Sequence, residues 1–77
     1  MQLKQGPDIP IRNGEMTLAT YYDREGLLTA SHLRRSDAPR GHGQFVLPDA
    51  LTLRGYRSVD ELKQRCERYV ERDLIES

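Results

Sequence analysis

The pattern of apolar and polar positions is most regular over residues 16–33. Two runs with β-branched, aromatic and other apolar residues, 16–22 and 27–33, flank the turn sequence Asp-Arg-Glu-Gly at 23–26. Aspartate suits the first position of a type I turn, and glycine suits the following position of positive φ. The pattern therefore predicts an antiparallel β-hairpin.

The register of this hairpin decides which side chains face the core. Pairing Asp23 with Leu27 places Tyr21 and Leu33 on the outer face of the sheet. The more apolar face, which we expect to lie on the core, holds Leu18, Tyr22, Leu28 and Ala30. Because side chains alternate with a period of two, a slip of one residue would exchange the two faces.

The segments on either side of the hairpin are less regular. Residues 1–14 contain two prolines and the turn pair Asn-Gly. They predict a loose arm that Ile9 and Ile11 anchor to the core edge, with a short turn into the first strand. Residues 34–44 contain one proline and two glycines without apolar periodicity, and they predict a mobile surface loop. Residues 45–47 predict a short strand, and residues 50–56 a further strand or a turn leading into one.

The C-terminal segment, residues 58–74, has the pattern of an amphipathic helix. Ser58 followed by Glu61 is a capping box, and Glu61 with Arg65 is a favourable pair four residues apart. We expect a helix from about 59 to 72, whose stripe of apolar residues packs on the sheet. This stripe holds Val59, Leu62, Cys66, Tyr69 or Val70, and Leu74.

These elements predict one α+β domain over residues 1–77. A small antiparallel sheet of three to four strands, within residues 15–57, would carry one C-terminal helix on one face, in the order β-β-β-(β)-α. The chain is 36% hydrophobic, without tryptophan and with one phenylalanine. So few large apolar groups predict a thin core, which a second copy or another protein would complete.

Charge and cysteine content change this picture little. The chain has 12 basic and 12 acidic residues. Residues 32–57 carry five arginines and two aspartates, a net charge of +3, whereas residues 58–77 carry four basic and six acidic residues, a net charge of −2. This asymmetry is too small to identify a nucleic-acid partner by itself. A single cysteine excludes an intrachain disulfide, and with no apolar leader or membrane-length stretch it predicts a cytoplasmic protein without membrane contact.

The sequence contains no recognisable catalytic or metal-binding motif. His32, His42 and Cys66 lack the spacing of a zinc site. Cys66 falls on the apolar stripe of the predicted helix, so we expect a small buried core residue. No phosphate-binding or nucleophile-elbow motif occurs, and so short a chain has little room for a deep pocket. We therefore expect no enzymatic activity, no metal and no cofactor.

The remaining candidates are binding surfaces. Tyr21 and Leu33 would be apolar anchors on the outer sheet face, where ordinary cross-strand packing is the alternative interpretation. The cationic candidates are Arg34, Arg35, Arg40 and His42 of the 34–44 loop, with Arg54 and Arg57. A solvated loop that only keeps the chain soluble is the alternative interpretation of these charges.

The resulting hypothesis is a non-catalytic protein-interaction module, a small regulatory or accessory protein of a bacterium or phage. Its partner would be an unknown protein or a second copy, which would make a homodimer. The alternative is nucleic-acid binding through the 34–44 loop with Arg54 and Arg57.

Overall fold

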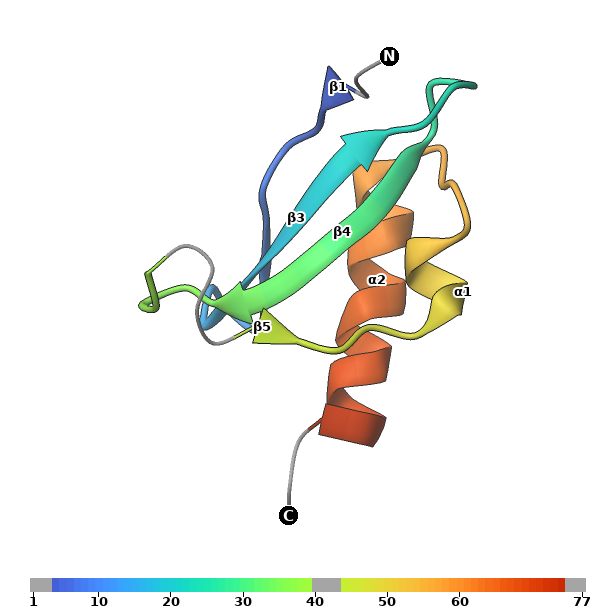
Figure 1. The fold of residues 1–77 in the computed structure, drawn as a ribbon. Helices are drawn as coiled ribbons and strands as arrows, with labels where there is room; N and C mark the ends of the chain where they lie inside the picture. Colours follow the sequence, from blue (N-terminus) through green and yellow to red (C-terminus); the bar gives the residue numbers. More distant parts are fainter. Residues whose placement is uncertain (1–3, 40–43, 75–77) are drawn as a thin grey trace.

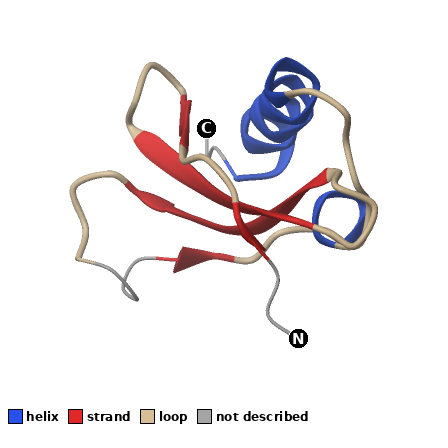
Figure 2. Cartoon of the chain, turned by 90° about the horizontal axis from the view of Figure 1, so that it is seen from above, coloured by secondary structure: helices blue, strands red, loops and turns tan. Residues whose placement is uncertain are grey.

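An antiparallel sheet with a helix on one face forms the structure, as the sequence predicts (Figure 1). The structure, a computed structural model, describes residues 4–39 and 44–74. Its elements are β1 (Lys4–Gln5), β2 (Ile9–Ile11), β3 (Met16–Tyr22), β4 (Leu28–Arg35), β5 (Gln44–Phe45), α1 (Asp49–Thr52), α2 (Val59–Tyr69) and the π-helical turn η1 (Val70–Leu74). The strand order is β1-β3-β4-β5, and β2 also pairs with β3. Figure 2 shows the twisted strands as one layer and α2 on one side of it.

The turn between β3 and β4 confirms the predicted hairpin. The Asp23 carboxylate accepts hydrogen bonds from the backbone N–H groups of Glu25, at 2.9 Å, and Leu27, at 2.8 Å. Gly26 has a φ of +81°, which glycine adopts without the steric cost of a Cβ. The turn therefore fixes the predicted register at this end, where Tyr22 pairs with Leu28.

A β-bulge in β4 changes the register further along. Thr20 pairs with Ala30, but Ala19, the residue before it in β3, pairs with His32, which leaves Ser31 without a partner in β3. One extra residue exchanges the two faces for everything beyond it. Leu33 therefore points into the core and is 0% exposed, so its predicted place on the outer face is wrong.

The N-terminal segment is more ordered than a loose arm. Ile9 and Ile11 lie in β2, pair with β3 and are buried, which confirms their anchoring role. The predicted turn follows them, with positive φ at Arg12, Asn13 and Gly14. The exposed edge of β3 gives this segment hydrogen-bond partners, and prolines are tolerated in such short edge strands.

Residues 50–56 form no strand of the sheet. The helix α1 follows Pro48, and only Tyr56 forms an isolated bridge, with Leu28. In a strand, Leu51 and Leu53 would share one face. In the helical turn they separate, so that Leu51 is 3% exposed and Leu53 is 78% exposed.

The helix α2 begins as predicted. Ser58 accepts a hydrogen bond from the backbone N–H of Glu61 at 3.1 Å. Val59 lies outside the buried stripe, and the α-helix ends at Tyr69, where η1 continues it. The core consists of Ile9, Ile11, Leu18, Leu28, Ala30, Leu33, Leu51, Tyr56, Leu62, Cys66 and Val70, with Tyr22 packed against it.

Leu33→Ala should lower the free energy of unfolding by about 2–5 kcal/mol, because the bulge places this side chain in the packed interior. The exposed Val46 is a matched control, and Val46→Ala should change the free energy by less than about 0.5 kcal/mol. Urea unfolding followed by circular dichroism measures both. Equal small effects would place Leu33 on the surface and contradict the bulge.

Candidate functional site

Two of the predicted loop arginines, Arg34 and Arg35, are the last two residues of β4. A guanidinium nitrogen of Arg34 donates to the carbonyl oxygens of Arg35, at 3.2 Å, and Ala38, at 3.5 Å. Arg35 forms an exposed ion pair with Asp37 at 3.0 Å. Arg34 and Arg35 thus belong to β4 and Gln44 to β5, so the predicted loop bounds 34 and 44 are both wrong. The predicted site residues Arg40 and His42 lie outside the described residues.

The other two arginines lie at the opposite end of β4. Arg54 and Arg57 are exposed and flank Tyr56, which pairs with Leu28, the first residue of that strand. The guanidinium carbon of Arg54 lies 5.4 Å from the centroid of the Tyr56 ring. At about 3.3 Å per residue, the length of β4 separates the two arginine pairs by roughly 20 Å. The structure therefore does not gather the four described arginines into one cationic surface.

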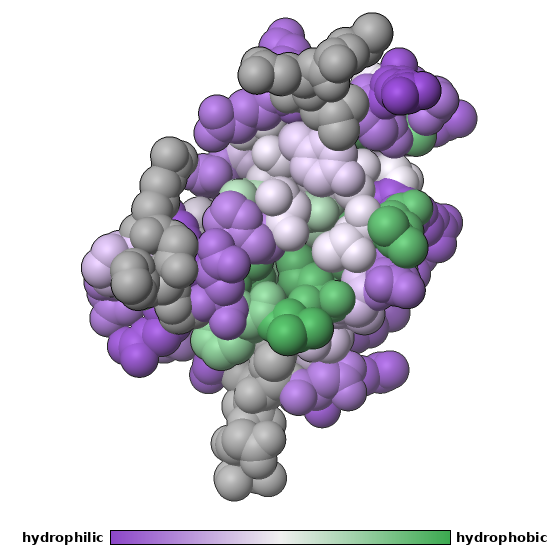
Figure 3. Space-filling view, viewed as in Figure 1, coloured by the Kyte–Doolittle hydropathy of each residue, from purple (hydrophilic) through white to green (hydrophobic). Residues whose placement is uncertain are grey.

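The outer face of the sheet offers one of the two predicted anchors. Tyr21 is half-buried and pairs with Thr29, whereas Leu33 faces the core. Figure 3 views this face, with α2 behind the sheet. Its middle is pale, and hydrophobic atoms gather over the β5–α1 connection and beside α1. The apolar surface is thus displaced from the sheet towards α1.

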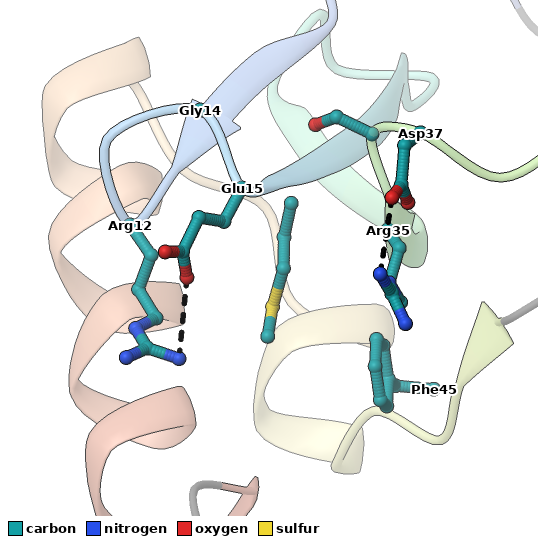
Figure 4. A pocket seen from close by; sticks show the side chains of 8 residues that line it. Arg12, Gly14, Glu15, Arg35, Asp37 and Phe45 are labelled. Atoms are coloured by element: carbon teal, nitrogen blue, oxygen red, sulfur yellow. Dashed lines mark hydrogen bonds and ion pairs between the residues drawn. The ribbon is translucent and has the colours of Figure 1, made fainter.

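A shallow groove lies between the β2–β3 turn and the start of the β4–β5 connection (Figure 4). Its volume is about 520 Å³. Figure 4 shows one ion pair on each side, Arg12–Glu15 at 3.4 Å and Arg35–Asp37 at 3.0 Å. Because each arginine has its own carboxylate, this groove is balanced in charge. The remaining lining residues are Gly14, Met16, Ser36 and Phe45.

A second groove, of about 200 Å³, lies between α1 and the C-terminal half of α2. Three exposed arginines line it, at the helical spacing i, i+3 and i+7. The full lining is Pro48, Ala50, Leu51, Tyr56, Arg65, Arg68, Tyr69, Arg72 and Asp73. We call Arg65, Arg68 and Arg72 the arginine row.

Sequence reasoning missed this row, although its spacing was visible. The net charge of residues 58–77 is negative, and a sum over a segment hides how a helix divides its charges between two flanks. On the other flank of α2, Glu67 accepts a hydrogen bond at 3.2 Å from the backbone N–H of Arg12, at the end of β2. The predicted pair of Glu61 with Arg65 is not among the ion pairs within 4 Å in the described ranges.

Of the two histidines, only His32 lies within the described residues. His32 is half-buried, and its Nδ1 lies 3.3 Å from the Ser31 hydroxyl beside the bulge. Within residues 4–39 and 44–74, no three His, Cys, Asp or Glu side chains are grouped to hold a metal ion.

The described residues form a small α+β domain with shallow grooves on its surface. No protein-family model matches the chain, and neither a curated protein nor a solved structure shows significant similarity to it. Among the described elements, no helix has both the length and the apolar character needed to cross a membrane.

Cys66 is the buried core residue that the sequence predicts. It lies on α2 between Leu62 and Val70, all three fully buried. Burial, and secondarily the negative charge of Glu67, raises the pKa of its thiol to about 12. The thiol therefore stays neutral near pH 7, and the nucleophilic thiolate is not populated.

This buried thiol should make the protein less stable as the pH rises from about 9 towards 12. The unfolded thiol ionises near its ordinary pKa of 9.0, while the folded thiol keeps its proton until about pH 12. The Cys66 contribution is thus fully present below pH 9 and is lost above it. Urea unfolding from pH ~8 to ~10 should show a smaller decline for Cys66→Ala than for the unchanged chain. Equal declines would contradict a neutral buried thiol.

Proposed function

We propose that this chain is a non-catalytic protein-interaction module, a small regulatory or accessory protein. The observation that carries the proposal is the exposure of two large apolar side chains on either side of α1. Val46 is 85% exposed and Leu53 is 78% exposed. Burying such a side chain stabilises a protein by about 1.5–3 kcal/mol, so leaving two outside a thin core favours a partner that covers them.

The backbone around both residues is held in place. The Val46 carbonyl accepts a hydrogen bond from the Tyr69 hydroxyl at 2.7 Å, which ties the β5–α1 connection to the end of α2. The Leu53 N–H donates to the Asp49 carbonyl at 2.8 Å and closes α1. A surface that is ordered before binding loses less conformational entropy when a partner covers it.

Nucleic-acid binding has less support from the geometry. The hypothesis needs the 34–44 loop and the Arg54–Arg57 segment to act as one surface, and the described arginines of the two segments lie at opposite ends of β4. A nucleic-acid surface also usually carries a net positive field and exposed aromatic rings for stacking. Here the formal net charge is zero, and the ring beneath Arg54 belongs to the buried Tyr56.

The double variant Val46→Ser with Leu53→Ser should bind its partner, another protein or a second copy, at least about 10-fold more weakly. The reason is that it removes two apolar contacts from the surface that the partner covers. Val59→Ser is the matched control, because Val59 is 40% exposed at the start of α2. Light scattering after size exclusion measures self-association. Quantitative capture on immobilised protein, from a lysate of cells that carry the gene, measures other partners.

The control should bind like the unchanged chain, within about 2-fold. Circular dichroism must show that both variants are folded. The proposal fails if the double variant then self-associates, and captures every other protein, as well as the control does.

A further inference from the structure

The arginine row concentrates positive charge in a small space. Arg65, Arg68 and Arg72 are exposed and line the groove between α1 and α2. At 1.5 Å per residue, the row is about 10 Å long. Asp73 is the one acidic residue of the lining, so the groove carries a formal charge of +2 from three arginines and one aspartate.

Within the described ranges, no ion pair within 4 Å involves an arginine of the row. The ion pairs within 4 Å there, Arg12–Glu15 and Arg35–Asp37, both belong to the other groove. The Glu67 carboxylate lies on the opposite flank of α2, where it accepts the Arg12 N–H. The helix thus presents Glu67 to the end of β2 and the arginine row to α1.

Beneath the arginines the groove is apolar and aromatic. Leu51 and Tyr56 are buried below it, and the half-buried Tyr69 stands within the row. A guanidinium group forms paired hydrogen bonds with a carboxylate, and these strengthen where apolar neighbours exclude water. The groove therefore combines carboxylate recognition with a place for one apolar side chain.

Resting on the proposed function, we infer that this groove binds an acidic segment of the partner protein. A partner helix with carboxylates at i, i+4 and i+7 would match the spacing of the row. The surface around Val46 adjoins the groove, because Pro48 lines it two residues further on and Tyr69 contacts the Val46 carbonyl. One partner segment can thus meet both the charges and the exposed valine.

Two other occupants fit the groove less well. A nucleic acid binds through many phosphates along an extended basic surface, whereas this row is short and shares its helix with exposed acidic residues such as Glu71. A second copy would offer carboxylates of its own α2 and η1, such as Glu67 and Glu71, which lie outside the groove lining. Because the two flanks face different directions, that contact is head-to-tail and builds rings or open chains instead of a two-fold symmetric dimer.

The test compares two triple variants that remove equal charge. The groove triple is Arg65→Gln, Arg68→Gln and Arg72→Gln. The control triple is Arg24→Gln, Arg35→Gln and Arg57→Gln, all exposed and outside the groove lining. The probe is a fluorescein-labelled helical peptide with glutamates at i, i+4 and i+7 around one leucine. Its matched peptide carries glutamines instead, and a single-stranded oligonucleotide of equal charge is the third ligand.

Fluorescence anisotropy should show that the acidic peptide binds, and that added salt weakens this binding. The groove triple should weaken it by at least about 10-fold, while the control triple should stay within about 2-fold, because only the groove triple removes the paired hydrogen bonds. The glutamine peptide should bind at least about 10-fold more weakly than the glutamate peptide.

Several results would overturn the inference. They are no binding of the acidic peptide, equal losses in both triples, or equal binding of the glutamine peptide. Oligonucleotide binding that only the groove triple abolishes, without peptide binding, would assign the groove to nucleic acid. Self-association that only the groove triple abolishes would assign it to a second copy. If the peptide fails while the double variant of Val46 and Leu53 still loses a captured partner, the interaction module stands and only the acidic ligand is wrong.

Discussion

The packing of α2 on the sheet is the contact on which the other features depend. Leu62, Cys66 and Val70 recur every four residues and are fully buried against the strands. A helix fixed along one stripe cannot rotate, so this stripe also decides where the polar flanks point. On one flank Glu67 accepts a hydrogen bond from the Arg12 N–H at the end of β2, and on the other flank the arginine row faces α1. Folding and surface charge are therefore set by the same periodicity.

The sheet packs on this helix with the help of the β-bulge in β4. Without the bulge at Ser31, Leu33 would face outward and the middle of the core would lose one of its largest fully buried side chains. Instead Leu33 pairs with Leu18, and both lie in the core. A chain with few large apolar residues gains from such a device, because it brings apolar residues from both halves of β4 to one face.

Short-range sequence signals predicted the turns and helix ends better than they predicted how these elements pack together. The Asp23 turn, the Ser58 cap and the buried Cys66 were predictable, since each depends on residues close in sequence. The bulge was not predictable, because the alternation of apolar and polar residues along β4 does not indicate where an extra residue is inserted. Residues 50–56 were ambiguous for the same reason: Leu51 and Leu53 fit a strand pattern, and only contact with α2 and β4 decides for a helical turn.

The candidate site could not be predicted for a related reason. A groove forms between two elements, and the sequence pattern describes each element separately without showing which ones lie side by side. The arginine row was visible as a spacing on one helix, but α1 supplies the other wall, and residues 50–56 predict a strand or a turn leading into one. Tyr69 then joins the two: its ring lines the groove while its hydroxyl holds the Val46 carbonyl. The arginine row and the exposed valine are thus connected through this side chain, which lies at the end of α2. A partner that binds here therefore depends on the same last turn of helix that completes the core through Val70.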